Sequence, residues 1–514
     1  MEKAYFLGID CGTTVVKSVL FDLAGTEIAG ASQEVPVTHP RPGWAEQSME
    51  QVWEAAQNTI RQAIEKAGVS GEDVKGVSLS GQGAGIWLIG KDGKPVRDAI
   101  TWLDGRVKDL IEKWQEDGTY DKLFEASGTL YWAGLGHCTI FPWFMENERD
   151  SLEKAKASVY CKDWVKFCLT GEISTDETDL LAITDPRTRT YSQDVIDLVG
   201  IGEYKHLLPP IIRSHEIAGY VTAEAAEATG LKKGTPVASG AWDCSSTALG
   251  VGCVKAGDAA SILGTAGIHQ AISDKPAVNK AYSLYLHAVP GTWLINSMAM
   301  LAASCLNWFE REFCQPEVWE AKEKGVSKYD VINEKVAQVP VGSNGVIFLP
   351  FLQGERAPFV RPDARGEFFG LGDWTTRQDL LRSVYEGVAL ATLDNYNCIE
   401  QGIPIGEVWL AGGGAQSEVW AQIVSDCTGK VMKVPFGTEF GCRGAAMNAA
   451  IAAGYFANHA EAAEAMVRVS RVHEPNLQNT AKYQELYAIY KDLIKGLWEP
   501  WRAMYNFVEK YREE

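Results

Sequence analysis

One short unit occurs in each half of the chain and limits how the chain can fold: a β-rich run, a Gly-Thr turn and a second β-rich run. The two turns are Cys11-Gly12-Thr13-Thr14 and Gly264-Thr265-Ala266-Gly267. A turn of this kind can aim backbone N–H groups and hydroxyls at a phosphate group. The repetition predicts two similar α/β halves, each with one such turn, and a boundary at about residues 250–257.

The residues around the first turn predict three strands, a helix and a further strand. Three β-rich runs predict an antiparallel meander: residues 4–10, 15–21 and 27–37. Ser48 is suited to cap the following helix, with Gln51 at capping-box spacing and Gly68 where a left-handed C-terminal residue belongs. Apolar residues in this segment recur at helical spacing, so one helix face is expected to pack on the sheet before the strand at 74–80.

The second half repeats part of this arrangement. Strands are predicted at 259–263, 268–272, 282–289, 292–296, 346–350, 407–411 and 430–435, and helices at 300–313, 376–402, from 417, 441–453 and 478–511. The helix at 441–453 is rich in Gly and Ala, so a neighbouring element could approach it closely. In the last helix Tyr483, Leu486, Tyr487 and Tyr490 share one side.

Composition excludes several classes of protein. The net charge of −19 would repel a nucleic-acid backbone or an anionic membrane, so neither is an expected partner. The 11 cysteines form no C-x-x-C pair, which argues against a zinc site and a disulfide framework and favours a reducing, cytoplasmic location. The N-terminus lacks the apolar run of a signal peptide, and the longest Ala-rich stretch, 445–457, is too short to span a membrane.

Three features are candidates for phosphate binding. Asp10 ends the first strand and could hold Mg²⁺ or its waters, while Lys17 could neutralise phosphate charge. Gly412-Gly413-Gly414 stands between a predicted strand and a predicted helix, and a helix N-terminus is a ready anion site. By contrast, Gly81-x-Gly83-x-Gly85 does not match the dinucleotide fingerprint, which disfavours a Rossmann dehydrogenase.

Several motifs in order resemble those of the FGGY family of carbohydrate kinases, over about residues 4–490. They are Asp10–Lys17, Ser80-Gly81-Gln82, Trp102-x-Asp104-x-Arg106, Gly240-Ala241-Trp242-Asp243, Gly264-Thr265-Ala266-Gly267, Gly354-Glu355-Arg356-Ala357-Pro358, residues 366–386, and Gly412-Gly413-Gly414-Ala415 with Ser417 and Trp420. The resemblance implies an α/β fold of two actin-like (ribonuclease H-like) ATPase domains, with ATP and a sugar or polyol in an interdomain cleft. The expected domains are 1–253, on the sugar side, and 254–514, on the nucleotide side with a helical tail.

The resemblance also assigns roles to residues. Asp243 would be the catalytic base that accepts the proton of the attacking hydroxyl, and Asp10 would organise Mg²⁺. The expected contacts of ATP are Thr13, Thr14, Lys17, Gly264, Thr265, Asn307, Gly413, Gly414 and Ser417. A positioned general base typically contributes about 10²–10⁴-fold to a rate. The expected activity is transfer of the γ-phosphate of ATP to a hydroxyl group.

The acceptor is the more open question. The expected acceptor-side residues are Gln82, Gly83, Ala84, Trp102, Asp104, Trp242 and Asp243, and Asp104 could instead pair with Arg106. Gly83 and Ala84 stand where glycerol kinases have an Arg-Glu pair and many xylulokinases Met-His, which weakens both of those assignments. Their form is similar to L-xylulose (3-keto-L-gulonate) and erythritol kinases. Small residues there would open the pocket or let backbone groups touch the ligand.

The predicted function is therefore that of a cytoplasmic, ATP- and Mg²⁺-dependent kinase for a ketopentose such as xylulose or a related sugar or polyol. Erythritol or another polyol is the alternative acceptor. An alternative of another class is an actin- or chaperone-like ATP-binding protein without sugar kinase activity, which would need a client-binding module or an assembly surface. The resemblance makes a homodimer a reasonable expectation.

Overall fold

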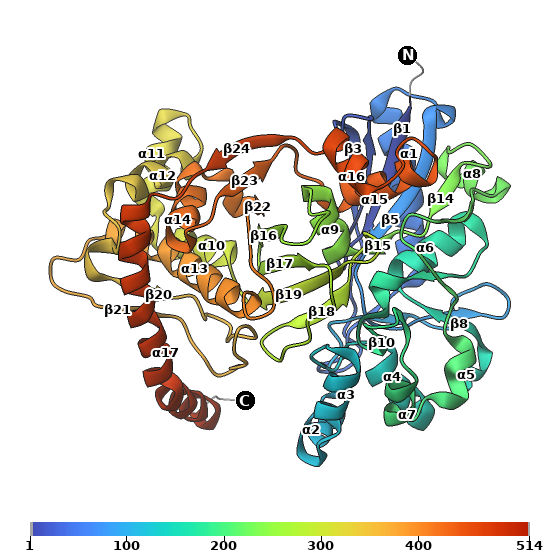
Figure 1. Cartoon of the computed structure of the whole chain (residues 1–514), viewed down its shortest axis with the longest axis horizontal. Coiled ribbons are helices and arrows are strands. Elements are labelled where there is room, and N and C mark those ends of the chain that lie inside the picture. Colours follow the sequence, from blue (N-terminus) through green and yellow to red (C-terminus); the bar gives the residue numbers. More distant parts are fainter. Residues whose placement is uncertain (1–3, 512–514) are drawn as a thin grey trace. The chain divides into compact units, whose positions relative to one another are not determined.

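The structure is a computed structural model that describes residues 4–511, and it contains two compact units (Figure 1). The first unit comprises the described residues up to Ala256 together with Ile272–Leu294 and Gly437–Arg468. The second comprises Gly257–Ala271, Ile295–Phe436 and the described residues from Val469 onward. The units are therefore discontinuous in sequence, whereas the predicted domains divide the chain once, between residues 253 and 254.

The first unit is built on a sheet with the strand order β13-β14-β5-β1-β2-β3, in which β15 also pairs with β5. Its strands are β1 (Tyr5–Cys11), β2 (Val15–Phe21), β3 (Glu27–Glu34), β5 (Val74–Gly81), β13 (Ile217–Tyr220), β14 (Pro236–Ala238) and β15 (Ala241–Trp242). The strands β1, β2 and β3 pair antiparallel in chain order, and β5 lies parallel to β1. The predicted meander and the strand that returns after the helix are confirmed.

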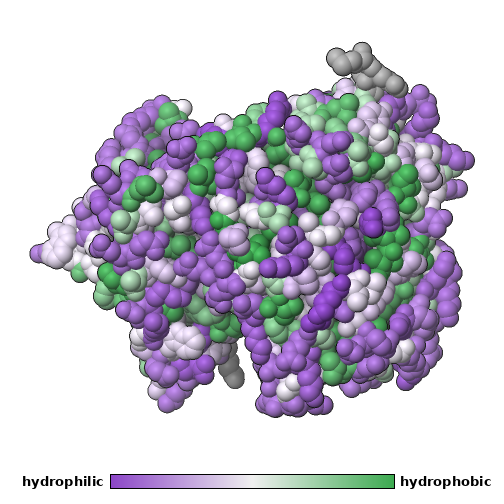
Figure 2. Space-filling model, in the orientation of Figure 1, coloured by the Kyte–Doolittle hydropathy of each residue, from purple (hydrophilic) through white to green (hydrophobic). Residues whose placement is uncertain are grey.

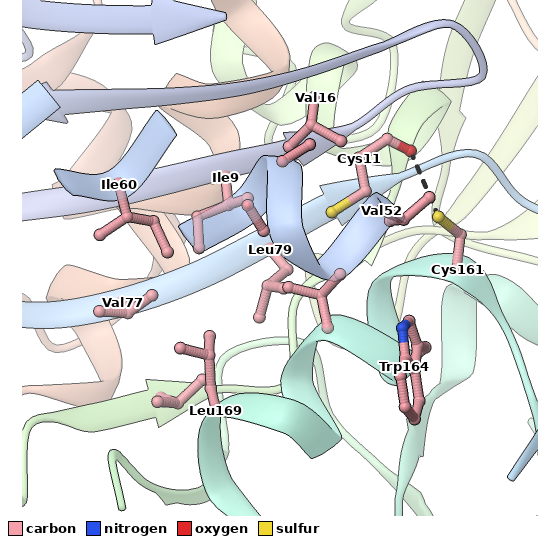
Figure 3. Close-up of a cluster of buried hydrophobic side chains, with 14 of the residues drawn as sticks. Ile9, Cys11, Val16, Val52, Ile60, Val77, Leu79, Cys161, Trp164 and Leu169 are labelled. Carbon is pink, nitrogen blue, oxygen red and sulfur yellow. Dashed lines mark hydrogen bonds between the residues drawn. The ribbon is translucent and has the colours of Figure 1, made fainter. Parts of the chain in front are cut away.

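The helix α1 (Met49–Ala67) covers one face of this sheet. Ser48 Oγ accepts a hydrogen bond from the backbone N–H of Gln51 at 3.3 Å, and Gly68 ends the helix with φ 63°. Val52 and Ile60 of α1 join the buried cluster that contains Ile9 and Leu79 of the sheet (Figure 3). The predicted cap positions and the apolar face are thus confirmed, and the face anchors the strand that ends in Asp10.

The predicted close approach to the Gly- and Ala-rich helix also occurs. This helix, α15 (Phe440–Ala452), packs against β1 and against α9 (Asp243–Val251). A Cβ on Gly444 would overlap the carbonyl oxygen of Ser246, and a Cβ on Gly250 would overlap that of Phe440. Ser246 Oγ also donates a hydrogen bond to the carbonyl oxygen of Gly441 at 2.9 Å. These contacts fix α9, and with it the residue at its N-terminus, on α15, which itself packs against β1.

The rest of the first unit surrounds these elements. It contains β4 (Glu46–Gln47), β6 (Trp87–Gly90), β7 (Ala99–Ile100), α2 (Lys108–Asp117), α3 (Thr119–Ser127), α4 (His137–Asn147), α5 (Arg149–Lys154), β8 (Ala155–Val159), α6 (Cys161–Thr170), β9 (Thr175–Asp176), η2 (Glu177–Ile183), β10 (Thr184–Asp185), β11 (Thr190–Tyr191), α7 (Gln193–Val199), η3 (Gly202–Leu207), β12 (Ile211–Ile212), α8 (Ala223–Thr229), β18 (Ser283–Leu286) and α16 (His459–Met466). Trp164 and Leu169 of α6 belong to the same buried cluster as α1 (Figure 3).

The second unit repeats the strand relations of the first, with the order β19-β17-β16-β22-β23-β24. Its strands are β16 (Ala259–Leu263), β17 (Gly267–Ser273), β19 (Trp293–Ala299), β22 (Val408–Ala411), β23 (Met432–Pro435) and β24 (Val469–His473). As β1 does with β2 and β5, β16 pairs antiparallel with the strand after its Gly-Thr turn and parallel with a later strand. The repeated unit in the sequence is thus a repeated unit of the fold.

Helices and a short hairpin complete the second unit. They are α10 (Ala303–Phe313), α11 (Gln315–Lys324), α12 (Lys328–Gln338), β20 (Ile347–Leu349), β21 (Glu367–Phe369), α13 (Arg377–Ile399), η5 (Gly413–Gln416), α14 (Glu418–Thr428) and α17 (Leu477–Tyr511). Thr376 and Asp379 form the predicted reciprocal cap of α13. In α17, Tyr483 and Tyr490 are buried, whereas Leu486 and Tyr487 are half-buried.

Hydrophilic side chains cover much of the visible surface, with apolar side chains scattered among them (Figure 2). Within residues 4–511, no helix is both long and apolar enough to cross a membrane.

Candidate functional site

The turn between β1 and β2 carries a buried carboxylate at its start. Asp10 lies opposite Lys17 in β2 and beside Ser80 in β5. Burial raises the pKa of Asp10, and nearby Ser80 and Lys17 act in the opposite direction. Asp10 Oδ1 is buried and has no hydrogen-bond partner among the described residues. A buried carboxylate oxygen without a partner is costly, so this oxygen is suited to bind a cation or a donor.

This arrangement fits a Mg²⁺ ion that shares its ligands with phosphate groups. Among residues 4–511, no group of three or more His, Cys, Asp or Glu side chains is arranged to hold a metal. Mg²⁺ usually keeps several waters and takes only one or two carboxylates together with substrate phosphates. The side chain that would hold it is Asp10, through the unpartnered Oδ1.

Asp243 is the first residue of α9, which directly follows β15. Its Oδ1 accepts a hydrogen bond from the backbone N–H of Cys244 at 2.6 Å. Burial raises the pKa of Asp243 to about 7, with a further increase from the negative charge of Asp10. A carboxylate whose pKa lies near neutrality is well matched to accept a proton from a hydroxyl group and release it later.

Lys17 and Glu439 form an ion pair beside this carboxylate pair, with 2.9 Å between Lys17 Nζ and Glu439 Oε2. Burial is the largest single effect and lowers the pKa of Lys17, but the hydrogen bond to Glu439 and the negative charges of Glu439 and Asp10 together outweigh burial, so the pKa is raised. The ammonium group is therefore charged, as a phosphate contact requires. Glu439 is a neighbour that the sequence reasoning did not include.

Four side chains link the first Gly-Thr turn to the expected acceptor side. The indole N–H of Trp102 donates to Thr13 Oγ1 at 2.8 Å, and Gln47 Nε2 donates to the Thr13 carbonyl oxygen at 2.7 Å. Gln82 Nε2 in turn donates to Gln47 Oε1 at 2.8 Å, while its own Oε1 is buried without a partner. The structure thus brings together Thr13, Gln82 and Trp102, whereas Thr14 is exposed.

Asp104 is engaged entirely by protein donors. Its two carboxylate oxygens accept from the backbone N–H groups of Ala45 and Arg106 at 2.7 and 2.9 Å, and from the Arg106 guanidinium at 2.8 and 2.9 Å. The same guanidinium also pairs with Glu46 at 2.7 Å and lies 3.8 Å from the centre of the Trp44 ring. This geometry favours the pairing of Asp104 with Arg106 that the sequence left open, and it fixes the loop that carries Trp102.

Trp242 occupies the space next to Gly83. A Cβ on Gly83 would lie 2.5 Å from Trp242 Nε1 and 3.1 Å from Asp179 Oδ1. The Trp242 ring is buried and meets Tyr285 edge-on, with 4.8 Å between ring centres. Ala84 is also buried and has a φ of 63°. The absent side chain at Gly83 therefore leaves no open space here, because the Trp242 indole fills it.

The second Gly-Thr turn is tied to the start of α10. The Thr265 carbonyl oxygen accepts from Ala302 N–H at 2.9 Å and from Ser304 Oγ at 2.6 Å, and the Gly264 carbonyl oxygen accepts from Ala303 N–H at 2.8 Å. The Thr265 side chain itself is exposed. Hydrogen bonds to its carbonyl oxygens hold the turn on the start of α10, while the Thr265 side chain remains accessible to a ligand.

The glycine turn after β22 lies beside the end of β16. Gly412 has a φ of 88°, and a Cβ on it would lie 2.7 Å from the carbonyl oxygen of Leu263, the residue before Gly264. A Cβ on Gly414 would also contact Leu263, whereas no atom lies within 4 Å of the corresponding position on Gly413. The second unit therefore places the glycines on both sides of the predicted Gly413 against Leu263, the residue that precedes the predicted Gly264.

The two remaining predicted nucleotide contacts are partly engaged by protein groups. Ser417 Oγ caps α14 by accepting from Trp420 N–H at 3.1 Å, and it donates to Asn333 Oδ1 at 2.7 Å. Asn307 is exposed on α10, where its Oδ1 accepts from the Tyr329 hydroxyl at 3.4 Å. Only Asn307 of these two presents its side chain to solvent.

Glu355 lies in one of the motifs that carry the family resemblance, but the sequence predicts no role for it. Glu355 Oε1 accepts from the backbone N–H groups of Met300 and Arg356 at 2.7 and 2.8 Å, and burial raises its pKa to about 7. Glu355 therefore fixes the segment that leads into α10. The start of α10 is in turn hydrogen-bonded to the Gly264 turn. No signal in the sequence shows this contact, because it joins two distant loops.

Comparison with known proteins identifies the family. The N-terminal domain of the FGGY family of carbohydrate kinases matches residues 5–250, and the C-terminal domain of the same family matches residues 259–453. The chain belongs to this family. FGGY kinases are ATP-dependent sugar kinases, so the expected fold of two actin-like domains and the expected enzyme class are confirmed.

Individual relatives in this family act on several acceptors. The chain is 31% identical over 500 residues to the L-xylulose/3-keto-L-gulonate kinase of Escherichia coli K12, covering 96% of this chain and 97% of that protein. It is 32% identical over 521 residues to the erythritol kinase of Brucella abortus, covering 96% of each. The crystal structure of xylulose kinase from Rhodospirillum rubrum matches with a TM-score of 0.86 and 27% identity, covering 97% of this chain and all (100%) of that one.

Proposed function

We propose that this FGGY kinase transfers the γ-phosphate of ATP to a hydroxyl group of a ketopentose such as xylulose, with Asp243 as the general base. The observation that carries the assignment of the base is the raised pKa of Asp243, about 7, at the N-terminus of α9 and within electrostatic range of Asp10. Phosphoryl transfer depends mainly on positioning and on charge stabilisation, so a well-placed base and charge partners are what the protein must supply.

The remaining site residues follow from this assignment. Asp10 holds Mg²⁺, which when bound neutralises charge on the transferred phosphoryl group. In the first unit, Thr13, Thr14 and Lys17 contact the phosphates of ATP. In the second unit the nucleotide contacts are Gly264, Thr265, Asn307, Gly413, Gly414 and Ser417. Gln82 and Trp102, which join Thr13 through the hydrogen bonds described above, bind the acceptor together with Trp242.

Two observations support a neutral ketose or polyol as the acceptor. Two of the three acceptors for which the E. coli and B. abortus relatives are named, L-xylulose and erythritol, are neutral, whereas 3-keto-L-gulonate is a sugar acid. Arg106 pairs with the carboxylates of Asp104 and Glu46 and is already neutralised by them. The charge of the cation nearest Trp102 in sequence is therefore balanced by protein carboxylates, although its Nη1 has no hydrogen-bond partner among the described residues, and this balance favours xylulose over a sugar acid and keeps erythritol as the alternative.

A coupled ADP-release assay tests the acceptor. The panel contains D- and L-xylulose, D- and L-ribulose, 3-keto-L-gulonate, erythritol, D-arabitol, gluconate and glycerol. The expected result is one strong ketopentose, with erythritol as the next candidate. Preferred turnover of gluconate or 3-keto-L-gulonate would overturn the neutral acceptor, and failure of every acceptor with ATP still bound would overturn the proposed reaction.

Association and location are also proposals. We propose a cytoplasmic enzyme that forms a homodimer, in keeping with the family resemblance. Sedimentation without ligands tests the homodimer, and either a monomer or a filament would contradict it.

Replacing Gly413 by Ala tests the nucleotide side. Gly413 has open space around the position of a Cβ, so the folded protein should tolerate the methyl group, with a melting temperature within about 2 °C of wild type. A nucleotide lying against this turn would meet the methyl group, so KM for ATP should rise by about 5–10-fold with little change in acceptor KM.

Gly496→Ala is the matched control, since Gly496 in α17 also has open space at the Cβ position. Steady-state kinetics with ATP varied at saturating acceptor, together with thermal melts of both variants, give the comparison. An unchanged KM for ATP in Gly413→Ala would remove Gly413 from the nucleotide site.

A further inference from the structure

We propose that Thr178 is a positioning residue for Asp243, and that a buried ion cluster around Lys162 holds Thr178 in place. The inference rests on the proposed function, because it concerns the group assigned there as the base. It assigns a role to η2 (Glu177–Ile183), a segment outside the motifs that predicted the site.

The link between Thr178 and the base is one hydrogen bond. The backbone N–H of Trp242 donates to Thr178 Oγ1 at 2.8 Å, and Trp242 immediately precedes Asp243. Trp242 is buried, so loss of this acceptor would leave its N–H group unpaired in the interior. The hydroxyl therefore fixes the backbone at the point where β15 passes into α9.

The ion cluster fixes the residues on both sides of Thr178. Lys162 Nζ lies 2.9 Å from Asp176 Oδ1 and 2.9 Å from Asp179 Oδ2, and all three side chains are fully buried. Asp176 Oδ2 also accepts from the backbone N–H of Thr178 at 2.9 Å and from Ser214 Oγ at 2.8 Å. Thr178 is thus held through its own backbone by Asp176, while its hydroxyl holds Trp242.

The composition of the ion cluster indicates that it positions Thr178 and contributes little to the free energy of unfolding. Asp163 is also buried there, and it bonds to Lys162 and to Lys166 at 2.7 and 2.8 Å, so three acidic side chains meet two lysines, and burial raises the pKa of Asp179 well above its usual value. Buried ion pairs are weak contributors to stability, because desolvation offsets their attraction. The same segment contains Leu181 at a φ of 41°, an unfavourable backbone conformation for leucine. Such energetic costs, from buried charges and a strained backbone, are typical of functional sites, where the surrounding structure maintains the geometry that the function requires.

The expected consequence of weakening this support is a loss in kcat. A base must lie within hydrogen-bond reach of the hydroxyl that it deprotonates. A displacement of about 1 Å by a change away from the chemistry can reduce a rate by about 10²-fold. The proposed contacts of ATP do not include Thr178, so KM for ATP should stay nearly unchanged when kcat falls.

The test replaces Thr178 by Val, which keeps the shape and removes the hydroxyl. The expected result is a kcat reduced by about 10–100-fold with the best acceptor of the panel, a KM for ATP within about twofold of wild type, and recovery of most of the activity in Thr178→Ser. Thr229→Val is the matched control, because Thr229 is also buried in the first unit and its hydroxyl bonds the backbone of Ala225 and Leu231 at 2.6 and 3.3 Å. This control should lose thermal stability and keep its kcat.

Equal loss of melting temperature in the two valine variants with wild-type kcat in both would overturn the inference. If Thr178→Val does not fold, the Asp176→Asn variant tests the inference instead. Asparagine keeps an acceptor for Thr178 N–H but removes the negative charge that pairs with Lys162. Its kcat should fall at least about threefold at unchanged KM for ATP, and an unchanged kcat would overturn the inference. Wild-type turnover on the panel separates these outcomes from failure of the proposed function, which would overturn both.

Discussion

Asp243→Asn should lower kcat by about 10²–10⁴-fold while leaving the affinity for ATP within about threefold of wild type. Asparagine has nearly the same shape as aspartate and can still accept the hydrogen bond from Cys244 N–H through its side-chain oxygen. It cannot take a proton from the acceptor hydroxyl. The substitution also removes a negative charge beside Asp10, which should if anything favour binding of the nucleotide phosphates.

The measurement combines turnover in the coupled assay with calorimetric titration of ATP. Asp194→Asn is the matched control, because Asp194 is exposed in α7 and the change in net charge is the same. The control should keep wild-type turnover. Turnover near the wild-type rate in Asp243→Asn would remove Asp243 as the base, whereas loss of both turnover and ATP binding would point to disruption of the fold.

The same assignment predicts the pH dependence of the wild-type enzyme. Only the ionised form of Asp243 can accept a proton, and burial raises the pKa of this group to about 7. The value of kcat/KM for the acceptor should therefore fall about tenfold per pH unit below pH 7 and level off above it, because this ratio reports the free enzyme. A flat profile between about pH 5 and pH 8 would contradict the assignment.

Much of the fold could be predicted because local signals set it. Ser48 and Gly68 mark the ends of α1, and Thr376 with Asp379 caps α13, since these bonds form between residues close in sequence. The discontinuity of the units could not be predicted in this way. Residues 437–468 belong to the first unit, where Gly444 of α15 meets the backbone of α9, and such packing depends on distant segments.

The residues of the candidate site could likewise be predicted only in part. The resemblance named Asp10 and Asp243, and the structure brings them within electrostatic range of each other. It did not reveal Gln47 or Thr178, whose roles come from hydrogen bonds across 34 and 64 positions of the sequence. It also could not decide whether Asp104 faces a ligand or Arg106, because that depends on which donors surround a buried carboxylate.

Gly83→Ala should impair acceptor use strongly, because the methyl group would meet the edge of the Trp242 ring. The added Cβ would lie 2.5 Å from Trp242 Nε1, well inside van der Waals contact. The ring has little freedom to move, since the backbone N–H of Trp242 is bonded to Thr178 and the ring packs edge-on with Tyr285. We expect a loss of about 1–3 kcal/mol in stability, typical of an overpacked interior. We also expect kcat/KM for the acceptor to fall by about 10–100-fold, since the displaced backbone leads directly into Asp243.

A double-mutant cycle separates this contact from a general defect. Trp242→Leu removes the ring, so Gly83→Ala should cost far less stability in that background, and the coupling energy should be at least about 1 kcal/mol. Gly202→Ala is the matched control, because no atom lies within 4 Å of its Cβ position, and it should leave both stability and kinetics unchanged. Additive losses in the cycle would show that Gly83 and Trp242 act independently. Strong coupling, with a change in acceptor preference in the double variant, would show that the indole takes the place of a side chain at position 83 in shaping the acceptor site.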